Sequence, residues 1–338
     1  MFEIGLLLLI FLLAIFLIGH FFNRKNLNKF LLKEDLISQC FLILSIFFFS
    51  NSLINFKADL GNLYTWREVL FLSSIIGLIV SYYFKAILVL IPTLIGIINW
   101  WIFQGSDWAF LLKIKTSSIL LGTFLIMTTL YVIGNIYEKK IKYKRFAKVY
   151  LILGIIAINS ALLFLSSEEG LRSFEYMTIG LSFLSSWKIT IPLLILAVFL
   201  MVLILYSVIT KTLSLLEVVF ILILILFFGI LVFLPQQKIF INGNGPLSDD
   251  GLIWAIIFNL IIFFEVLGLI FSGYIRKEVW LINLGTIFLF LLIILKYFDW
   301  FFTFLDKSIF FIGAGTLLFG VGWLMERGRR IAVANIKI

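Results

Sequence analysis

Long runs of apolar residues, separated by short polar stretches, follow one another along the chain. A helix needs about 20 apolar residues to cross a bilayer core of roughly 30 Å, and the sequence offers eleven runs near this length. Only Lys85 separates the third run from the fourth, so residues 69–103 form either two helices or one interrupted element, and the count is ten or eleven. The predicted spans are 4–22, 36–56, 69–84, 86–103, 116–137, 149–165, 189–209, 218–234, 252–272, 279–295 and 309–325.

The composition makes lipid the solvent for most of the chain. Of the 338 residues, 63% are hydrophobic and 13% are charged, whereas a soluble domain is near half apolar with roughly a quarter charged. A soluble globule cannot hide this excess, because much of its surface still faces water. The predicted fold is therefore all-α, a polytopic membrane helical bundle that forms a single membrane domain over 1–338.

The basic residues predict how the bundle is oriented. A net charge of +9 would suggest a nucleic-acid partner in a soluble protein, but here the lysines and arginines cluster in short loops between apolar runs, where they set topology. About two-thirds of the 27 basic residues lie on the inner side if the N-terminus is outside. The sequence thus predicts an N-out, C-in protein surrounded by membrane lipids, with no nucleic acid as partner.

Tryptophan positions agree with this placement, because indole rings prefer the headgroup level of a bilayer. Two polar segments on the outer side are the longest. The first, 166–188, opens with Ser and Glu residues suited to a helix N-terminus and predicts an interfacial helix. The second, 235–251, is rich in Gly, Asn and Pro and predicts an irregular loop. The tryptophans near predicted outer ends are Trp66, Trp100, Trp101, Trp108, Trp187, Trp254 and Trp300.

Residue types that perform catalysis or bind metals are sparse. The chain has one histidine, His20, and one cysteine, Cys40, too few for a His/Cys metal site, a Ser/His arrangement or an intrachain disulfide. The pair Asp249–Asp250 is open to two interpretations, outer carboxylates of a membrane enzyme or the N-terminal cap of the next helix. We favour the cap, because the first outer loop, 57–68, is short for a membrane glycosyltransferase. We predict no catalytic, cofactor-binding or metal-binding residues and a protein that is not an enzyme.

Glu265 is an acid deep inside the span 252–272. A carboxyl at such depth costs about 2.5 kcal/mol or more unless it is partnered or protonated. The next span returns antiparallel and brings Asn283 or Thr286 to a similar depth, so we predict a hydrogen bond to one of them that holds the two helices together. A proton- or ion-coupled role and snorkelling towards the lipid edge are the alternatives. Three other polar residues within spans, each predicted to bond to a neighbouring helix, are Asn99, Asn135 and Asn159.

The end of the chain carries a recognisable pattern. Over about 275–330 it resembles a family of bacterial multi-pass membrane proteins of unknown function, whose members end with N-L-G, basic-Y-F-D, D-basic-S, glycine-rich and arginine-rich segments. The resemblance implies a C-terminal helical hairpin, a bacterial inner (cytoplasmic) membrane and a small periplasmic protein as a partner. The matching segments are Leu281-Ile-Asn283-Leu-Gly285, Lys296-Tyr297-Phe298-Asp299, Leu305-Asp306-Lys307-Ser308, Gly313-Ala-Gly315 and Glu326-Arg327.

Two functions are open on this reading. The first is a non-enzymatic membrane component, structural or partner-binding, and the second is a transporter or channel for a small solute or lipid with Glu265 on its path. The spans are filled with Leu, Ile and Phe, which cannot replace the hydration shell of a solute. We therefore expect a dry interior and an outer concavity lined by some of Lys296, Asp299, Asp306 and Lys307 and by the loop 235–251. These four side chains form either an ion-paired hairpin, which we favour, or a binding site.

Overall fold

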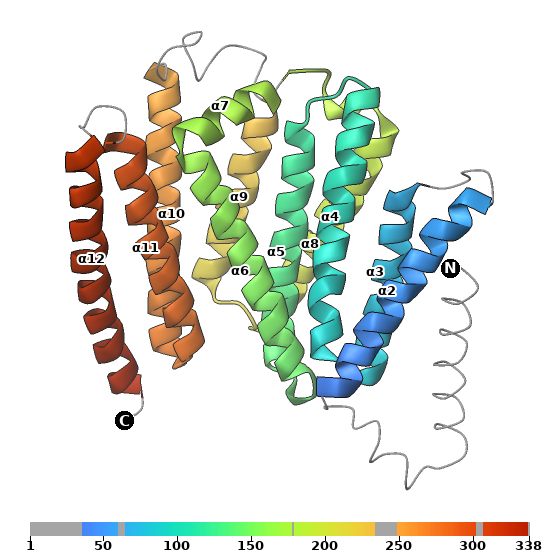
Figure 1. Cartoon of the computed structure of the whole chain (residues 1–338), viewed down its shortest axis with the longest axis horizontal. Helices are drawn as coiled ribbons and strands as arrows, with labels where there is room; N and C mark the ends of the chain where they lie inside the picture. Colours follow the sequence, from blue (N-terminus) through green and yellow to red (C-terminus); the bar gives the residue numbers. More distant parts are fainter. Residues whose placement is uncertain (1–35, 60–64, 178, 234–248, 302–306, 337–338) are drawn as a thin grey trace, which may run out of the picture. The chain divides into compact units, whose positions relative to one another are not determined.

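The computed structural model describes most of the chain. The residues described are 36–59, 65–177, 179–233, 249–301 and 307–336 (Figure 1). The predicted first span at 4–22 and nearly all of the predicted loop at 235–251 lie outside these residues. Within them, the regular structure is helical apart from one isolated bridge between Ile114 and Leu181.

Eleven α-helices and two short 3-10 helices make up this described part. The α-helices are α2 (Leu36–Asp59), α3 (Trp66–Phe84), α4 (Ile87–Leu111), α5 (Ser117–Glu138), α6 (Lys144–Ser166), α7 (Glu168–Met177), α8 (Trp187–Ile209), α9 (Leu215–Phe233), α10 (Asp249–Arg276), α11 (Val279–Phe301) and α12 (Lys307–Ile336). The 3-10 helices are η2 (Ile141–Tyr143) and η3 (Phe183–Ser185).

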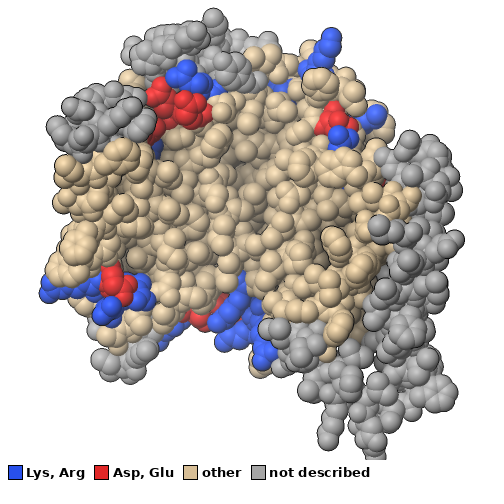
Figure 2. Space-filling model, in the orientation of Figure 1, with Lys and Arg blue, Asp and Glu red and all other residues tan. Residues whose placement is uncertain are grey.

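Eight of the described helices are long and apolar enough to cross a membrane, judged by length and composition: α2, α3, α4, α5, α6, α8, α10 and α11. Each overlaps one of the predicted spans. The predicted span 218–234 corresponds to α9, whose apolar segment Glu217–Ile230 is shorter, and the predicted span 309–325 lies within α12. On the face drawn in Figure 2, charged side chains gather near helix ends and uncharged ones cover the middle. The described part of the chain is thus helical, and its long apolar helices are those of a membrane protein.

The helices divide into two compact units. Unit 1 consists of Met1–Gly154 and Gly180–Phe233, and unit 2 consists of Ile155–Ile179 and Leu234–Ile338. Helix α6 begins in unit 1 and ends in unit 2. The single membrane domain stays a prediction.

In unit 1, residues 69–103 form two helices. The chain leaves α3 at Lys85, whose φ of 55° is left-handed, and the Ala86 N–H donates to the Ser81 carbonyl at 2.9 Å. The two helices then pack closely, because a Cβ at Gly77 would overlap the Thr93 hydroxyl. Small residues allow this approach between membrane helices. The turn at Lys85 and the close packing show that residues 69–103 form a helical hairpin and not one interrupted element.

Helix α5 lies at the centre of unit 1, where about two-thirds of its span is buried. The Trp101 ring of α4 lies against Gly122 of α5, where any Cβ would overlap the indole, and its Nε1 donates to the Ile119 carbonyl at 3.0 Å. The assignment of Trp101 to an outer helix end is wrong. Helix α4 continues to Leu111 rather than ending near residue 103, and because the Trp101 indole packs against α5 it is 1% exposed and belongs to the core.

An aromatic cluster joins α3, α5 and the start of α6 in unit 1. The Tyr82 hydroxyl donates to the Tyr137 hydroxyl at 3.2 Å and shares a hydrogen bond of 2.9 Å with the Tyr150 hydroxyl. The rings of Tyr143 and Phe146 pack edge-on or tilted against Tyr82. Rings at such separations attract one another beyond their buried area, so the cluster ties three helices together at one end.

In unit 2, α7 turns sharply off the end of α6 (Figure 1). A Cβ at Gly170 would collide with the Phe164 carbonyl, so the corner requires glycine. The Ser167 hydroxyl accepts the Gly170 N–H at 3.0 Å and caps α7, while Leu171 and Phe174 are fully buried. The structure thus places a helix of ten residues, with one buried face, inside the interval 166–188.

The left-handed residue at the α3–α4 corner yields a stability prediction. The left-handed backbone conformation costs a non-glycine residue roughly 1–2 kcal/mol. Glycine adopts it without this cost. We expect Lys85→Gly to be more stable than Lys85→Ala by up to about 1 kcal/mol, measured as thermal unfolding in detergent. Both variants lose the same charge, so equal stability would contradict the assigned backbone conformation.

Candidate functional site

A buried polar pair joins α6 to α10 in unit 2. The Asn159 Nδ2 donates to the Glu265 Oε1 at 3.0 Å and to the Ile155 carbonyl, also at 3.0 Å. The Asn159 side chain is fully buried. The remaining oxygens of the pair, Glu265 Oε2 and Asn159 Oδ1, are buried and have no hydrogen-bond partner among the residues that the structure describes.

The predicted pairing of Glu265 with Asn283 or Thr286 is wrong. Asn283 Oδ1 accepts a hydrogen bond from Arg329 at 3.0 Å, and the Thr286 hydroxyl donates to the Ile282 carbonyl of its own helix. The physical reason is rotational: these two positions of α11 line a groove against α12. Glu265 instead meets a residue that lies 106 positions earlier in the chain. The predicted bond from Asn159 to another helix is confirmed.

The two unpaired oxygens of the Asn159–Glu265 pair define what it can do chemically. Both are acceptors when the carboxyl is ionised, so neither can satisfy the other. One proton on Oε2 would convert that atom into a donor. The pair is therefore an interhelical hydrogen bond with room for one further proton.

At the other end of α11, two of the predicted site residues lie together. Lys296 Nζ donates to Asp299 Oδ2 at 3.1 Å and also to the carbonyl of Ser166, the last residue of α6. Asn259 of α10 donates to the same carbonyl at 3.3 Å. A cation at a helix C-terminus complements the helix dipole, so Lys296 and Asn259 join the α6–α7 corner to α10 and α11.

The other two residues of the predicted outer cluster are not placed. Asp306 lies outside the described residues, and Lys307 begins α12 with a side chain that is also outside them. The predicted ion pair is observed for Lys296 and Asp299, which are mostly buried. Asp249 and Asp250 form the start of α10, and their side chains lie outside the described set.

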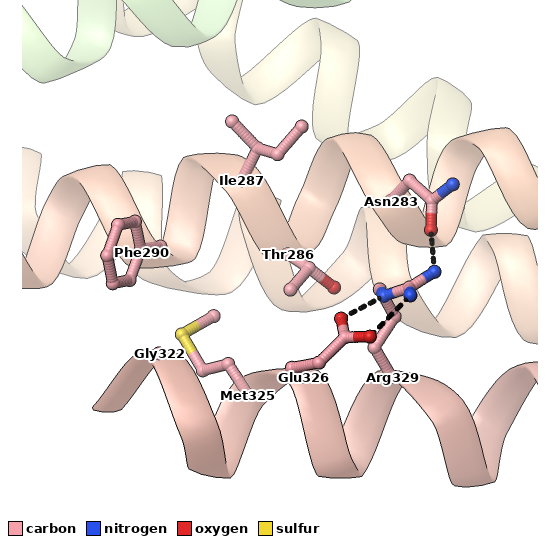
Figure 3. Close-up of a pocket in the computed structure, with 8 residues that line it drawn as sticks. All are labelled: Asn283, Thr286, Ile287, Phe290, Gly322, Met325, Glu326 and Arg329. Atoms are coloured by element: carbon pink, nitrogen blue, oxygen red, sulfur yellow. Dashed lines mark hydrogen bonds and ion pairs between the residues drawn. The ribbon is translucent and has the colours of Figure 1, made fainter. Parts of the chain in front are cut away.

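A groove of about 420 Å³ opens between α11 and α12 (Figure 3). Helix α11 forms one wall of the groove, with a polar part followed by an apolar part along the helix. Helix α12 forms the opposite wall. The residues that line the groove are Asn283, Thr286, Ile287, Phe290, Gly322, Met325, Glu326 and Arg329. Asn283 and Thr286, predicted as partners of Glu265, therefore belong to this groove.

Arg329 organises the polar end of the groove. Its Nε and Nη2 donate to the two carboxylate oxygens of Glu326 at 2.6 and 2.7 Å, and its Nη1 donates to Asn283 (Figure 3). Arg330 donates to Glu326 at 2.8 Å. Glu326 lies just beyond the predicted span 309–325, and these hydrogen bonds lower its pKa to about 2. The carboxylate is charged at neutral pH.

The sequence interpretation missed Arg329 and Glu326 as a site. The available signal was the spacing, because arginines three and four residues after an acid lie on the same helix face. It does not reveal the third partner, Asn283, which lies 46 positions earlier. Within the part of the chain that the structure describes, no three His, Cys, Asp or Glu side chains come together to hold a metal ion.

Comparison with known proteins gives no further guide to the site. The chain matches no protein-family model, no curated protein and no solved structure. The resemblance over 275–330 to a bacterial membrane protein family stays a prediction.

The Asn159–Glu265 bond can be measured with a double-mutant cycle. We expect Glu265→Leu to lower thermal stability in detergent by about 1 kcal/mol, the typical worth of such a bond between membrane helices. Glu265→Gln should be tolerated, because an amide can accept from Asn159 Nδ2 and donate to Asn159 Oδ1.

The cycle is completed by Asn159→Leu and by the double variant Asn159→Leu/Glu265→Leu. A coupling of about 1 kcal/mol is expected if the two side chains interact directly. Additive effects of the two single changes would show that Glu265 has a different partner in the folded protein.

Proposed function

We propose that the protein is a non-enzymatic component of a bacterial inner membrane, with a structural or partner-binding role. The observation that carries this proposal is how polar groups inside the spans are used. Asn159 and Glu265 bond to each other, Asn259 bonds to the end of α6, and the α5 hydroxyls of Thr128 and Thr129 bond to carbonyls one turn earlier. These groups serve the helices themselves, as expected of a bundle whose task is to hold its own shape.

A face of α12 supports the partner-binding role. Thr316 and Gly320 stand one turn apart, and a Cβ at Gly320 would meet no atom of the described residues within 4 Å. Phe319 is 80% exposed and Trp323 is 56% exposed beside them. Small residues spaced by four let a second membrane helix approach closely, so we assign this face to a transmembrane helix of a partner. The small periplasmic protein implied by the family resemblance would fit if it carries such a helix.

Photo-crosslinking in membranes tests the partner-binding role. A photoreactive amino acid at Phe319 should give one discrete crosslinked protein, whereas the same group at Ile195, an exposed apolar position of α8, should give none. Adding Gly320→Leu should reduce the crosslinked yield severalfold, because the leucine side chain blocks close helix approach. The matched control is Gly328→Leu, which fills open space elsewhere on α12. Equal crosslinking from positions 319 and 195 would reject the proposed face.

The orientation that goes with this proposal is N-out and C-in, with the α5–α6 corner inside and the α7–α8 segment outside. Cysteine accessibility in spheroplasts tests it, starting from a Cys40→Ala background. Leu184→Cys, at an exposed position of η3, should react with a membrane-impermeant thiol reagent. Ile141→Cys, exposed in η2, should react only after the membrane is opened. The reverse pattern would overturn the orientation.

A transporter or channel is the second candidate, supported by the unpaired Oε2 of Glu265 and Oδ1 of Asn159. Membrane carboxyls that exchange protons mark transport pathways. Proteoliposomes under an imposed potential would then take up protons faster than protein-free liposomes, and Glu265→Gln would abolish the difference. Proton uptake equal to that of protein-free liposomes would leave the structural role as the better account.

A further inference from the structure

The groove between α11 and α12 runs from a polar end to an apolar end. The two helices are antiparallel neighbours, so that Asn283 lies beside Arg329 and Phe290 lies beside Gly322 (Figure 3). Seven residues separate the two levels on each helix, which is about 10 Å of helical rise. The volume of about 420 Å³ falls within the range of roughly 300–1,000 Å³ typical of small-molecule sites.

The apolar part of this groove is open to an apolar occupant. Ile287, Phe290 and Met325 form its walls, and Gly322 contributes no side chain. A Cβ at Gly322 would make an ordinary contact with the Phe290 ring at 3.7 Å and fill part of the space. In a membrane, the apolar group that is available to fill this part of the groove is a lipid acyl chain.

The polar part of the groove lies at a cationic end of unit 2. Arg329 has five N–H donors, of which Glu326 and Asn283 take three. Arg327 stacks over the exposed Trp323 ring, 5.5 Å from its centroid. Helix α10 ends at this level of the hairpin with a further basic pair. The charged residues of this end in the described structure are Arg276, Lys277, Arg327, Arg329 and Arg330, against the acids Glu278 and Glu326.

We propose that the groove binds an anionic phospholipid, with one acyl chain between α11 and α12 and its phosphate against Arg329 and Arg330. Arg presents paired donors that match phosphate oxygens. The excess of cations at the polar end selects an anionic headgroup over a zwitterionic one, because a zwitterionic headgroup brings a second, positive group close to the same arginines. The groove is lined by other residues of α12 than Thr316 and Gly320, so it does not depend on the partner-binding role.

Native mass spectrometry of the full chain in detergent measures this binding. Phosphatidylglycerol and phosphatidylcholine with the same acyl chains are the probes. We expect one phosphatidylglycerol to bind with about tenfold preference, because the choline cation of phosphatidylcholine is repelled by the arginines that hold the phosphate. Equal affinity for the two lipids would overturn the selection of an anionic headgroup.

Variants separate the two ends of the site. Gly322→Leu fills the apolar part and should weaken binding of both lipids, whereas Gly328→Leu, outside the groove and in open space, should weaken neither. Arg329→Gln should remove the preference for phosphatidylglycerol. The matched control Arg172→Gln removes an arginine of α7 that pairs with Glu168 and should keep the preference.

Glu326→Gln provides a test with the opposite sign. Because Glu326 occupies donors of both Arg329 and Arg330, neutralising it should raise the affinity for phosphatidylglycerol, and more than it raises that for phosphatidylcholine. Thermal unfolding of each variant shows whether it is folded. Unchanged or weaker phosphatidylglycerol binding by a folded Glu326→Gln protein would overturn the proposal, as would equal effects of Gly322→Leu and Gly328→Leu.

Discussion

The core of a bilayer contains no water to satisfy a polar group, so each donor and acceptor there needs a partner within the protein. This constraint explains how the described helices use their polar residues. Thr123, Thr128 and Thr129 return their hydroxyls to their own helix α5. Glu265 cannot do this with a carboxylate, which only accepts, and therefore needs a donor from a second helix. Asn159 supplies it, and the two remaining oxygens of this pair are among the few buried polar atoms of the described residues for which the rule is incompletely met.

The same constraint places most of the charged residues of unit 2 at helix ends. There, some join elements of the fold and others line an open groove. Lys296 of α11 donates to the last carbonyl of α6 and to Asp299, so both of its interactions stabilise the fold. Arg329 also has an internal partner in Glu326, yet it stands on the rim of an open groove with donors left over. Lys296 therefore belongs to a structural ion pair, whereas Arg329 keeps N–H donors that a ligand in the groove could use.

Close helix approach supplies the cohesion that the hydrophobic effect does not supply in lipid, where side chains and acyl tails are equally apolar. Gly77 meets Thr93 between α3 and α4, and Gly122 meets the Trp101 ring between α4 and α5. On α12, by contrast, Gly320 meets nothing within the described chain. Gly77 and Gly122 thus allow helices of the bundle to pack closely, whereas Gly320 leaves a surface on which another helix can pack.

The sequence by itself determined the solvent of this chain and the position of most of its helices, because twenty consecutive apolar residues have few alternatives to a membrane helix. It also identified Glu265 and Asn159 as polar residues in need of partners. Only the tertiary structure decided which partners they take: periodicity assigns a residue to a helix face, but it does not say which helix that face meets. Glu265 bonds to α6 rather than to its sequence neighbour α11, and Asn283 turns to Arg329 of α12. The groove likewise depends on two helices meeting, so no single stretch of sequence encodes it.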